Sequence, residues 1–479
     1  MQRVPSHPDL LLLYPMDFGE EGHTQPLGSI HEDQKQELDQ KVDEVATPEE
    51  ARGSQEQKVD LRSRQEKKTS SVQFFAVCWT LILGGWNDGS TGPLLPRIQE
   101  VYNLNYIVLS LVFIFACGGF MIGSVANMYI TPRLGFGKTL VLASLLQILA
   151  YCLQAPAPPF GVFLLGYAIA GASFSLQDAQ ANGFVANLKH HAKSKMGILH
   201  ACYGFGLFAA PFVSTQFAQR RKWSYHFLIS LGMAISNTVT QTVVFRFKSL
   251  NGERLPMSLC PPPLLTIQWT LLVTQSECLV LGGEPQTESS EDSEVSLFKH
   301  VMRSRTTHSI AFFISAHLGV AAALGGWIVT YIVRVRGGGP SAGYISAGVS
   351  GGAMLGRVAL LRLNKMLGER NAVFIYSVIC VGLEITAWRV PSLVGDAVAV
   401  CFVGLLLGPM YPMAMNRASR LLPGWMLTGS IGWIAGFGQT GSALVPFITG
   451  VVSNKYGLES LFPVQVPFQL FCYSIWLNA

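Results

Sequence analysis

Charged residues are scarce in this chain. Only 13% of its 479 residues are charged and 49% are hydrophobic, whereas roughly a quarter of the residues in an average soluble domain are charged. The charges gather in short clusters between apolar runs, several of which reach the roughly 20 residues needed to cross a bilayer. This composition excludes an ordinary soluble protein. The net charge of +5 gives no indication of a nucleic-acid partner, because Lys and Arg beside membrane spans report orientation instead.

Motifs for catalysis and metal binding are lacking as well. The nine cysteines include no Cys-x-x-Cys spacing, so neither a disulfide framework nor a zinc site is expected. There is no His-Glu-x-x-His, and no Gly-rich stretch has the spacing of a phosphate-binding loop. We therefore expect that the chain is not an enzyme and holds no metal and no cofactor.

Twelve apolar runs are the candidate membrane spans. An isolated span in lipid satisfies its backbone only as a helix, and these runs are longer than the roughly ten alternating residues of a barrel strand. The predicted fold class is an all-α integral membrane protein with twelve transmembrane helices in two pseudo-symmetric halves of six. The predicted spans are 72–95, 106–130, 137–155, 160–186, 196–217, 225–246, 308–333, 343–363, 371–389, 395–415, 426–452 and, more weakly, 461–477.

The segment before the first span is predicted to be a disordered tail, 1–71. Residues 29–68 are rich in Glu, Gln, Lys and Asp and poor in aromatics, and such a composition buries too little apolar surface to fold alone. The N-terminal half is then 72–246. The C-terminal half is 308–479, whose last helix is weak or truncated.

The central loop, 247–307, separates the two halves. It contains a nearly span-like stretch that is interrupted by Gln268, Gln275 and Glu277. A thirteenth helix would invert the second half, so we interpret 253–282 as an anomalous insertion. Lys and Arg are concentrated in the segments on the tail's side, apart from a cluster at 220–222. Both termini are therefore expected in the cytoplasm, with the chain in the plasma membrane or an internal membrane.

Three short motifs recur at similar spacing. "GGFMIGSVANMYITPRLG" at 118–135 resembles "GGAMLGRVALLRLNKMLG" at 351–368, with an offset of 233 residues. "GFG" recurs with an offset of 232 and "GGW" with an offset of 241. A nearly constant offset between corresponding spans indicates two homologous halves. Transporters are often built in this way, with the solute held between the halves near the middle of the membrane.

The turn after the second span carries the first family resemblance. Gly123, Arg133, Gly135 and Lys138 fit a degenerate version of the signature of the major facilitator superfamily, although Asn127 stands where an Asp is usual. The resemblance covers residues 72 to about 460. It implies the major facilitator fold and a conformational role for these turns. The related positions after span eight are Gly356, Arg357 and Gly368.

Two further motifs resemble the fucose permease branch of that superfamily, and the whole chain looks like a fungal member. They are "NDGSTGPLLP" in span one and "LQDAQANGFV" in span four. By this resemblance, Asp88 and Asp178 occupy the positions of the proton-coupling acids. A carboxylate in a bilayer costs several kcal/mol, so it normally faces a cavity or a partner. The alternative for Asp88 is that it caps a broken helix or holds a water. Glu384 in span nine has no such match and is the weaker candidate.

Polar residues near these acids are the expected solute contacts. In span five, His200 and Tyr203 stand where the resembled sugar carriers have amides. Both can still bind hydroxyl groups, and their rings can stack on a sugar or an aromatic solute. The alternative for His200 is a neutral histidine bonded within the bundle. The full set of expected solute-binding residues is Asn87, Gln177, Asn182, His200, Tyr203 and Trp327.

The sequence therefore predicts a secondary active transporter. We expect proton-coupled symport of a small solute such as a sugar, in which the two halves rock around a central site. The partners are then the solute, protons and the lipid bilayer. An uncoupled facilitator and a non-transporting receptor or regulator on a carrier fold remain open as alternatives.

Overall fold

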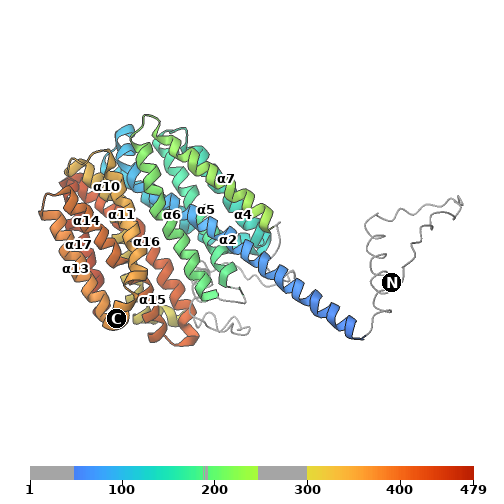
Figure 1. Cartoon of the computed structure of the whole chain (residues 1–479). Coiled ribbons are helices and arrows are strands. Elements are labelled where there is room, and N and C mark those ends of the chain that lie inside the picture. Colours follow the sequence, from blue (N-terminus) through green and yellow to red (C-terminus); the bar gives the residue numbers. More distant parts are fainter. Residues whose placement is uncertain (1–47, 187, 189–191, 246–298, 479) are drawn as a thin grey trace, which may run out of the picture. The chain divides into compact units, whose positions relative to one another are not determined.

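The computed structural model describes residues 48–186, 188, 192–245 and 299–478 (Figure 1). The chain divides into two units, Met1–Ser70 and Ser71–Ala479. The predicted spans all lie in the second unit. The described residues are almost entirely helical, and no strand occurs among them.

The N-terminal half contains six long helices joined by short turns. Because the turns are short, neighbouring helices run in opposite directions. A 3-10 turn, η1 (Trp223–Tyr225), precedes the last helix of this half. The six helices are α2 (Pro48–Tyr102), α3 (Tyr106–Leu134), α4 (Phe136–Gln154), α5 (Phe160–Ala186), α6 (Ala192–Ala218) and α7 (His226–Phe245).

The C-terminal half repeats this arrangement with two broken spans. The eighth span bends by 59° between α11 and α12, and the tenth breaks between α14 and α15 at Pro409, as proline breaks helices. Short 3-10 turns, η3 (Pro340–Gly343) and η4 (Leu458–Ser460), connect spans at one membrane face. The helices are α10 (Arg305–Val335), α11 (Tyr344–Ala359), α12 (Leu361–Leu367), α13 (Glu369–Arg389), α14 (Leu393–Leu407), α15 (Met410–Leu421), α16 (Gly424–Tyr456) and α17 (Leu461–Asn478).

These helices make up the twelve predicted spans. Nine of the described helical stretches are long and apolar enough to cross a membrane, and the bent pair α11 and α12 adds a tenth. The remaining two of the twelve spans, the first and the last, correspond to α2 and α17. The weak last span is a regular helix of 18 residues. Its apolar signal is low partly because Gln465 and Gln469 are buried in it.

The structure describes part of the predicted N-terminal tail and none of the proposed insertion. α2 begins at Pro48, so the part of the expected disordered tail that the structure describes is helical. Residues 48–68 are rich in Glu, Gln, Lys and Arg, which are good helix formers, and they run directly into the first span. The rest of the tail, 1–47, and the proposed insertion, 253–282, lie outside the described residues.

Glycines bring α3 and α5 into backbone contact. A Cβ atom added to Gly119 would lie 1.9 Å from the carbonyl oxygen of Ala168, and one added to Gly123 would lie 2.4 Å from that of Ala172. Small residues at helix interfaces permit such close approach in membranes. A larger residue at either position would push the two helices apart.

The same contact recurs 233 residues later, between α11 and α14. A Cβ atom on Gly352 would lie 2.3 Å from the carbonyl oxygen of Cys401, and one on Gly356 would lie 1.9 Å from that of Leu405. Each of these four residues follows its counterpart in α3 or α5 by 233 positions. The offset found in the sequence is therefore also an offset in packing, which confirms the prediction of two related halves.

The halves meet at one membrane face. We call the face that holds Ser71 and the turn at Gly135 the tail face, and the face that holds Asn103 and the turn at Ala157 the far face. Toward the far face, α6 contacts the start of α11: Gln216 donates a hydrogen bond to the Tyr344 hydroxyl, and Gln219 donates one of 2.5 Å to the carbonyl of Pro340.

Other contacts between the halves also lie away from the tail face. In α2, a Cβ atom on Gly92 would lie 2.3 Å from the carbonyl oxygen of Gly325 in α10. Toward the tail face, His200 of α6 and Arg357 of α11 lie on opposite halves, within electrostatic reach of each other. Both side chains are nevertheless exposed, so the halves do not cover them. Among the described residues, no hydrogen bond joins the halves on that side. The space between the halves, which we call the gap, is thus closed at the far face.

Candidate functional site

Asp88 lies on α2 where this helix packs most closely on α6. A Cβ atom on Gly85 would lie 2.0 Å from the carbonyl oxygen of Tyr203, so the glycine allows α6 to approach. The Tyr203 hydroxyl donates a hydrogen bond of 2.6 Å to Oδ2 of Asp88. The Asn87 amide donates one of 3.2 Å to Oδ1. Because α2 continues through Asp88 to Tyr102, Asp88 does not cap a broken helix.

Asp88 is exposed, although it lies in the middle of a span. Tyr203 is half-buried and its ring stacks on Phe174 of α5, with centroids 5.8 Å apart. The carboxylate therefore has two donors from the protein and an open side. A bound solute or a proton can reach that open side.

Asp178 and Asn182 form a second acid–amide pair on α5. The Asn182 amide donates a hydrogen bond of 3.0 Å to Oδ1 of Asp178, as the spacing of one helical turn allows. Tyr203 interacts electrostatically with both Asp88 and Asp178. The Tyr203 hydroxyl thus contacts Asp88 directly, whereas Asp178 is bonded to Asn182.

A chain of buried amides runs from Asn87 into the N-terminal half. Oδ1 of Asn87 accepts a hydrogen bond of 3.3 Å from the Tyr151 hydroxyl, which accepts one of 3.3 Å from Gln147. Gln177 donates to Oε1 of Gln147 at 3.0 Å and accepts from Asn237 at 3.0 Å. Gln177 is only 1% exposed. Its amide is therefore used within the half and does not face the gap, in contrast to the expected contact with solute.

Arg357 lies near the site, although it was not among the expected solute-binding residues. It was grouped with the turn after span eight, although the predicted span 343–363 includes it; in the structure it lies in the last turn of α11, which ends at Ala359. It is exposed, and its Nε donates a hydrogen bond of 3.3 Å to the carbonyl of Gly408. His200 and Tyr203 of the N-terminal half both lie within its electrostatic reach. The C-terminal half thus contributes a cation to the gap.

Trp327 lies away from this cluster. It is fully buried in α10, and its indole donates a hydrogen bond of 2.9 Å to the carbonyl of Pro446. Its ring contacts Tyr106 and Phe113 of α3, with centroids 5.9 and 6.2 Å away. This packing joins the two halves and leaves no surface for a solute in this conformation.

The predicted turn residues divide into two kinds. Gly135 and Gly368 lie between helices with φ values of 76° and 74°, a conformation that favours glycine, and they are 233 positions apart. Arg133 and Lys138 are exposed beside Gly135. Gly123 and Gly356 instead lie inside helices, where they permit close packing.

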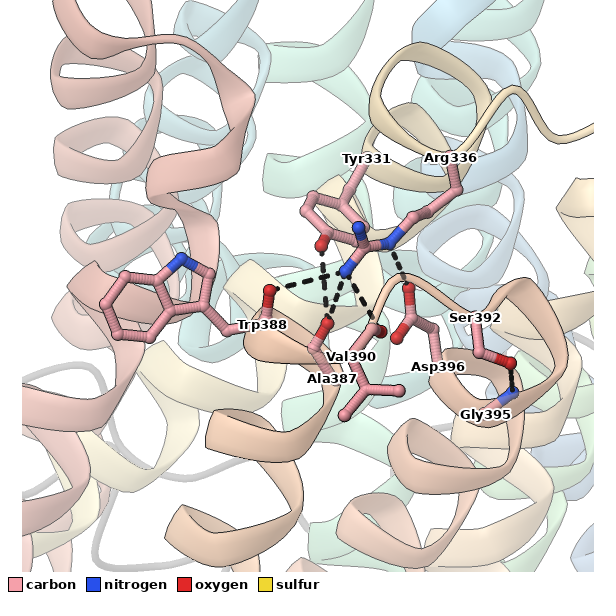
Figure 2. A network of polar contacts seen from close by, with 8 residues as sticks. All are labelled: Tyr331, Arg336, Ala387, Trp388, Val390, Ser392, Gly395 and Asp396. Carbon is pink, nitrogen blue, oxygen red and sulfur yellow. Dashed lines mark hydrogen bonds and ion pairs between the residues drawn. The ribbon is translucent and has the colours of Figure 1, made fainter.

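A second polar network ties three spans of the C-terminal half together at the far face (Figure 2). Nε of Arg336, just after α10, lies 2.6 Å from Oδ2 of Asp396 in the first turn of α14. Its Nη2 donates a hydrogen bond of 2.6 Å to the carbonyl of Ala387, at the end of α13. The guanidinium also lies over the ring of Tyr331. Asp396 is fully buried, so this network is a structural clamp and not part of the gap.

Glu384 is fully buried in α13. The Gln469 amide of α17 donates a hydrogen bond of 2.7 Å to its Oε1, and Oε2 has no partner in the structure. The position of Glu384 within the C-terminal half matches neither Asp88 nor Asp178. Among the described residues, no group of three or more His, Cys, Asp or Glu side chains could hold a metal ion.

Known proteins share both the sequence pattern and the fold. The chain is 23% identical over 410 residues to "Bypass of stop codon protein 6" of Saccharomyces cerevisiae, covering 81% of this chain and 78% of that protein. It is 23% identical over 423 residues to "Putative glucose/galactose transporter" of Helicobacter pylori, covering 85% and 96%. The crystal structure of the E. coli fucose:proton symporter FucP superposes with a TM-score of 0.52 and 14% identity, covering 86% of this chain and 99% of FucP.

A family model also matches most of the chain. The match to the Major Facilitator Superfamily extends over residues 77–446, from the first span to the eleventh. This agrees with the two halves of six helices, the repeated glycine contacts and the turns at Gly135 and Gly368. The chain is a multi-pass integral membrane protein and belongs to the Major Facilitator Superfamily.

Proposed function

We propose that this protein is a proton-coupled symporter of a small hydroxylated solute such as a sugar. The observation that carries the proposal is the pair Asp88 and Tyr203: an embedded carboxylate that is exposed to the gap and bonded to a phenol at 2.6 Å. An embedded acid of this kind is a functional candidate by default. Relatives and structural neighbours whose names state sugar or fucose:proton transport support the same function.

The two protonation states of Asp88 would present different surfaces to a solute. The charged carboxylate accepts hydrogen bonds from Tyr203 and Asn87. A protonated carboxyl group would offer a donor, and the Tyr203 hydroxyl could then turn toward a solute hydroxyl. Solute binding and proton binding at this position would therefore favour each other, which is what symport needs. Asp178, an acid within a span that is bonded to the Asn182 amide, would act as the second acid.

The arrangement of the halves suits alternating access. We infer that the tail face is cytoplasmic, because Lys and Arg are concentrated on that side. The contacts at the far face would then close the exterior, and the gap would face the cytoplasm. Rocking of the related halves around the gap would open the other face. The glycine contacts within each half would keep it rigid during this motion.

The test is solute-dependent proton entry into liposomes. The reconstituted protein would be loaded with an internal pH indicator and given fucose, other hexoses and small organic solutes. We expect solute-dependent acidification in wild type and its loss in Asp88→Asn and Asp178→Asn. Glu459→Gln, which neutralises an exposed acid at the far face, is the matched control and should behave like wild type.

Two other outcomes would replace the proposal. Solute entry without acidification, unchanged in both Asp variants, would make the protein an uncoupled facilitator. Specific binding of a solute without flux would make it a receptor on a carrier fold.

A further inference from the structure

Arg357 is a charged side chain that the C-terminal half presents to the gap. It is exposed on α11, well inside the membrane-spanning unit, and one of its nitrogens is bonded to the carbonyl of Gly408. Among the ion pairs of the described residues, none involves Arg357. An arginine in a span is costly to bury and normally has a partner or a function. Within the part of the chain that the structure describes, no carboxylate forms an ion pair with Arg357.

The repeat shows that packing does not require an arginine here. The counterpart of Arg357, 233 positions earlier, is Ser124, and the counterpart of Gly408 is Ser175. In the N-terminal half these two serines share a hydrogen bond of 2.7 Å. In both halves the helix approach is fixed by glycines, with Gly356 next to the arginine itself. A small polar residue therefore satisfies this contact, and the guanidinium is an addition that faces the gap.

The groups around Arg357 favour an anion. His200, Tyr203 and Tyr411 lie within its electrostatic reach, as does His317 of α10. Neutral imidazoles and phenols can donate hydrogen bonds, although the Tyr203 hydroxyl donates to Asp88 in this conformation. The two acids of the gap, Asp88 and Asp178, belong to the opposite half. Arg357 thus places a cation opposite these acids, and its planar guanidinium matches a carboxylate better than a neutral hydroxyl.

We propose that Arg357 binds the carboxylate of an anionic solute, so that the substrate class is a small hydroxylated carboxylic acid such as a sugar acid. This inference rests on the proposed carrier function of the gap. The solute would be held between the two halves, with its carboxylate on Arg357 and its hydroxyl groups near Asp88 and Tyr203. A proton that moves with the anion would balance its charge during transport.

Binding to the purified full-length protein tests this directly. Isothermal titration would compare matched probes that differ in one group: galactose with galacturonate, and glucose with glucuronate and gluconate. We expect the acid of a pair to bind about tenfold more tightly or better, as charge-assisted hydrogen bonds allow. Tighter binding of the neutral member, or absence of binding by every acid in the panel, would overturn the proposal.

Two substitutions locate the preference. Arg357→Gln should bring the affinities for acid and neutral sugar to within a few-fold of each other, and Arg357→Lys should retain part of the preference because it keeps a point charge. Arg362→Gln, which removes an exposed cation from α12, is the control and should retain all of it. A preference that survives Arg357→Gln would contradict the assignment. A thermal unfolding curve like that of wild type confirms that each variant is folded.

These measurements separate the inference from the proposed function. Binding does not depend on proton movement, so selective acid binding by a protein that shows no proton entry would support Arg357 and reject coupling. Proton entry with a neutral sugar, together with equal binding of the sugar and its acid, would support coupling and reject the role of Arg357.

Discussion

Tyr203 and Asp88 are joined by a hydrogen bond of 2.6 Å across the contact between α2 and α6. The contact is close because Gly85 has no side chain to hold the helices apart. The phenol also interacts electrostatically with Asp178. Tyr203 is therefore the hydroxyl donor to the embedded carboxylate of Asp88, and its removal is an informative perturbation.

Tyr203→Phe should impair coupled transport without unfolding the protein. The ring can keep its stacking on Phe174, whereas Asp88 loses a donor. Because a hydrogen bond to a charged group contributes about 1.5–3 kcal/mol, we expect a fall of about tenfold or more in solute uptake driven by a pH gradient. The measurement is initial uptake into liposomes at fixed internal pH. Uptake at the wild-type rate would show that the bond has no role in coupling.

Glycine substitutions test the packing of the two halves. Gly119→Ala would place a Cβ atom 1.9 Å from the carbonyl oxygen of Ala168, whereas Gly118→Ala, its neighbour, meets nothing within 4 Å. Overpacking typically costs about 1–3 kcal/mol, so Gly119→Ala should lower the thermal unfolding temperature in detergent. Gly352→Ala, its repeat counterpart, should act in the same way. Equal stability of Gly118→Ala and Gly119→Ala would contradict the close contact between α3 and α5.

The Arg336–Asp396 clamp should contribute strongly to stability (Figure 2). Asp396→Ala leaves a largely buried guanidinium without its carboxylate, and removing one partner of a buried pair costs about 3–5 kcal/mol. Arg336→Lys keeps the charge but cannot reproduce the contacts to both Asp396 and Ala387. It should therefore lower the stability of the protein by less than Asp396→Ala does. The measurement is again thermal unfolding.

A surface ion pair provides the comparison for this clamp. Arg97 and Glu100 also form an ion pair of 2.8 Å, but their side chains are 25% and 63% exposed. Glu100→Gln should therefore change stability by about 0–1 kcal/mol at most. If Asp396→Ala has an effect as small as that of Glu100→Gln, the clamp is not a structural element.

Glu384 is expected to be structural and unrelated to proton coupling. It is fully buried and bonded to Gln469. Glu384→Gln has nearly the same shape, so it should retain both folding and coupled uptake. Glu384→Ala leaves the buried Gln469 amide without its acceptor and should destabilise the protein by about 1–3 kcal/mol. Loss of coupling in a well-folded Glu384→Gln variant would assign this acid to the transport cycle instead.

Most of the fold follows from the sequence. Long apolar runs in a bilayer form helices, because a helix satisfies the backbone hydrogen bonds within one span. The offset of 233 residues between Gly118 and Gly351 is also found in the packing contacts of Gly119 and Gly352. The sequence does not predict the bend between α11 and α12. It also does not predict that α2 starts at Pro48, because composition alone does not separate a solvated tail from a solvated helix.

The site was less accessible to sequence reasoning. Embedded acids are rare enough to attract attention, so Asp88 and Asp178 are found from sequence. The direction in which a polar side chain points cannot be predicted from sequence in this way. Gln177 points into a network with Gln147 and Asn237, away from the gap. Arg357 was grouped with the turn residues because of the resemblance to the turn after span two, and nothing in the sequence indicates that it faces the gap. The clamp was missed because Arg336 and Asp396 are 60 residues apart and belong to no motif.

The central claim is that Asp88 couples solute movement to protons, and comparison of two transport modes in Asp88→Asn tests it most directly. Exchange of labelled for unlabelled solute across liposomes needs no net proton movement, whereas accumulation driven by a pH gradient does. We predict that Asp88→Asn retains exchange and loses accumulation, while wild type performs both. Accumulation by Asp88→Asn at the wild-type level would contradict the account.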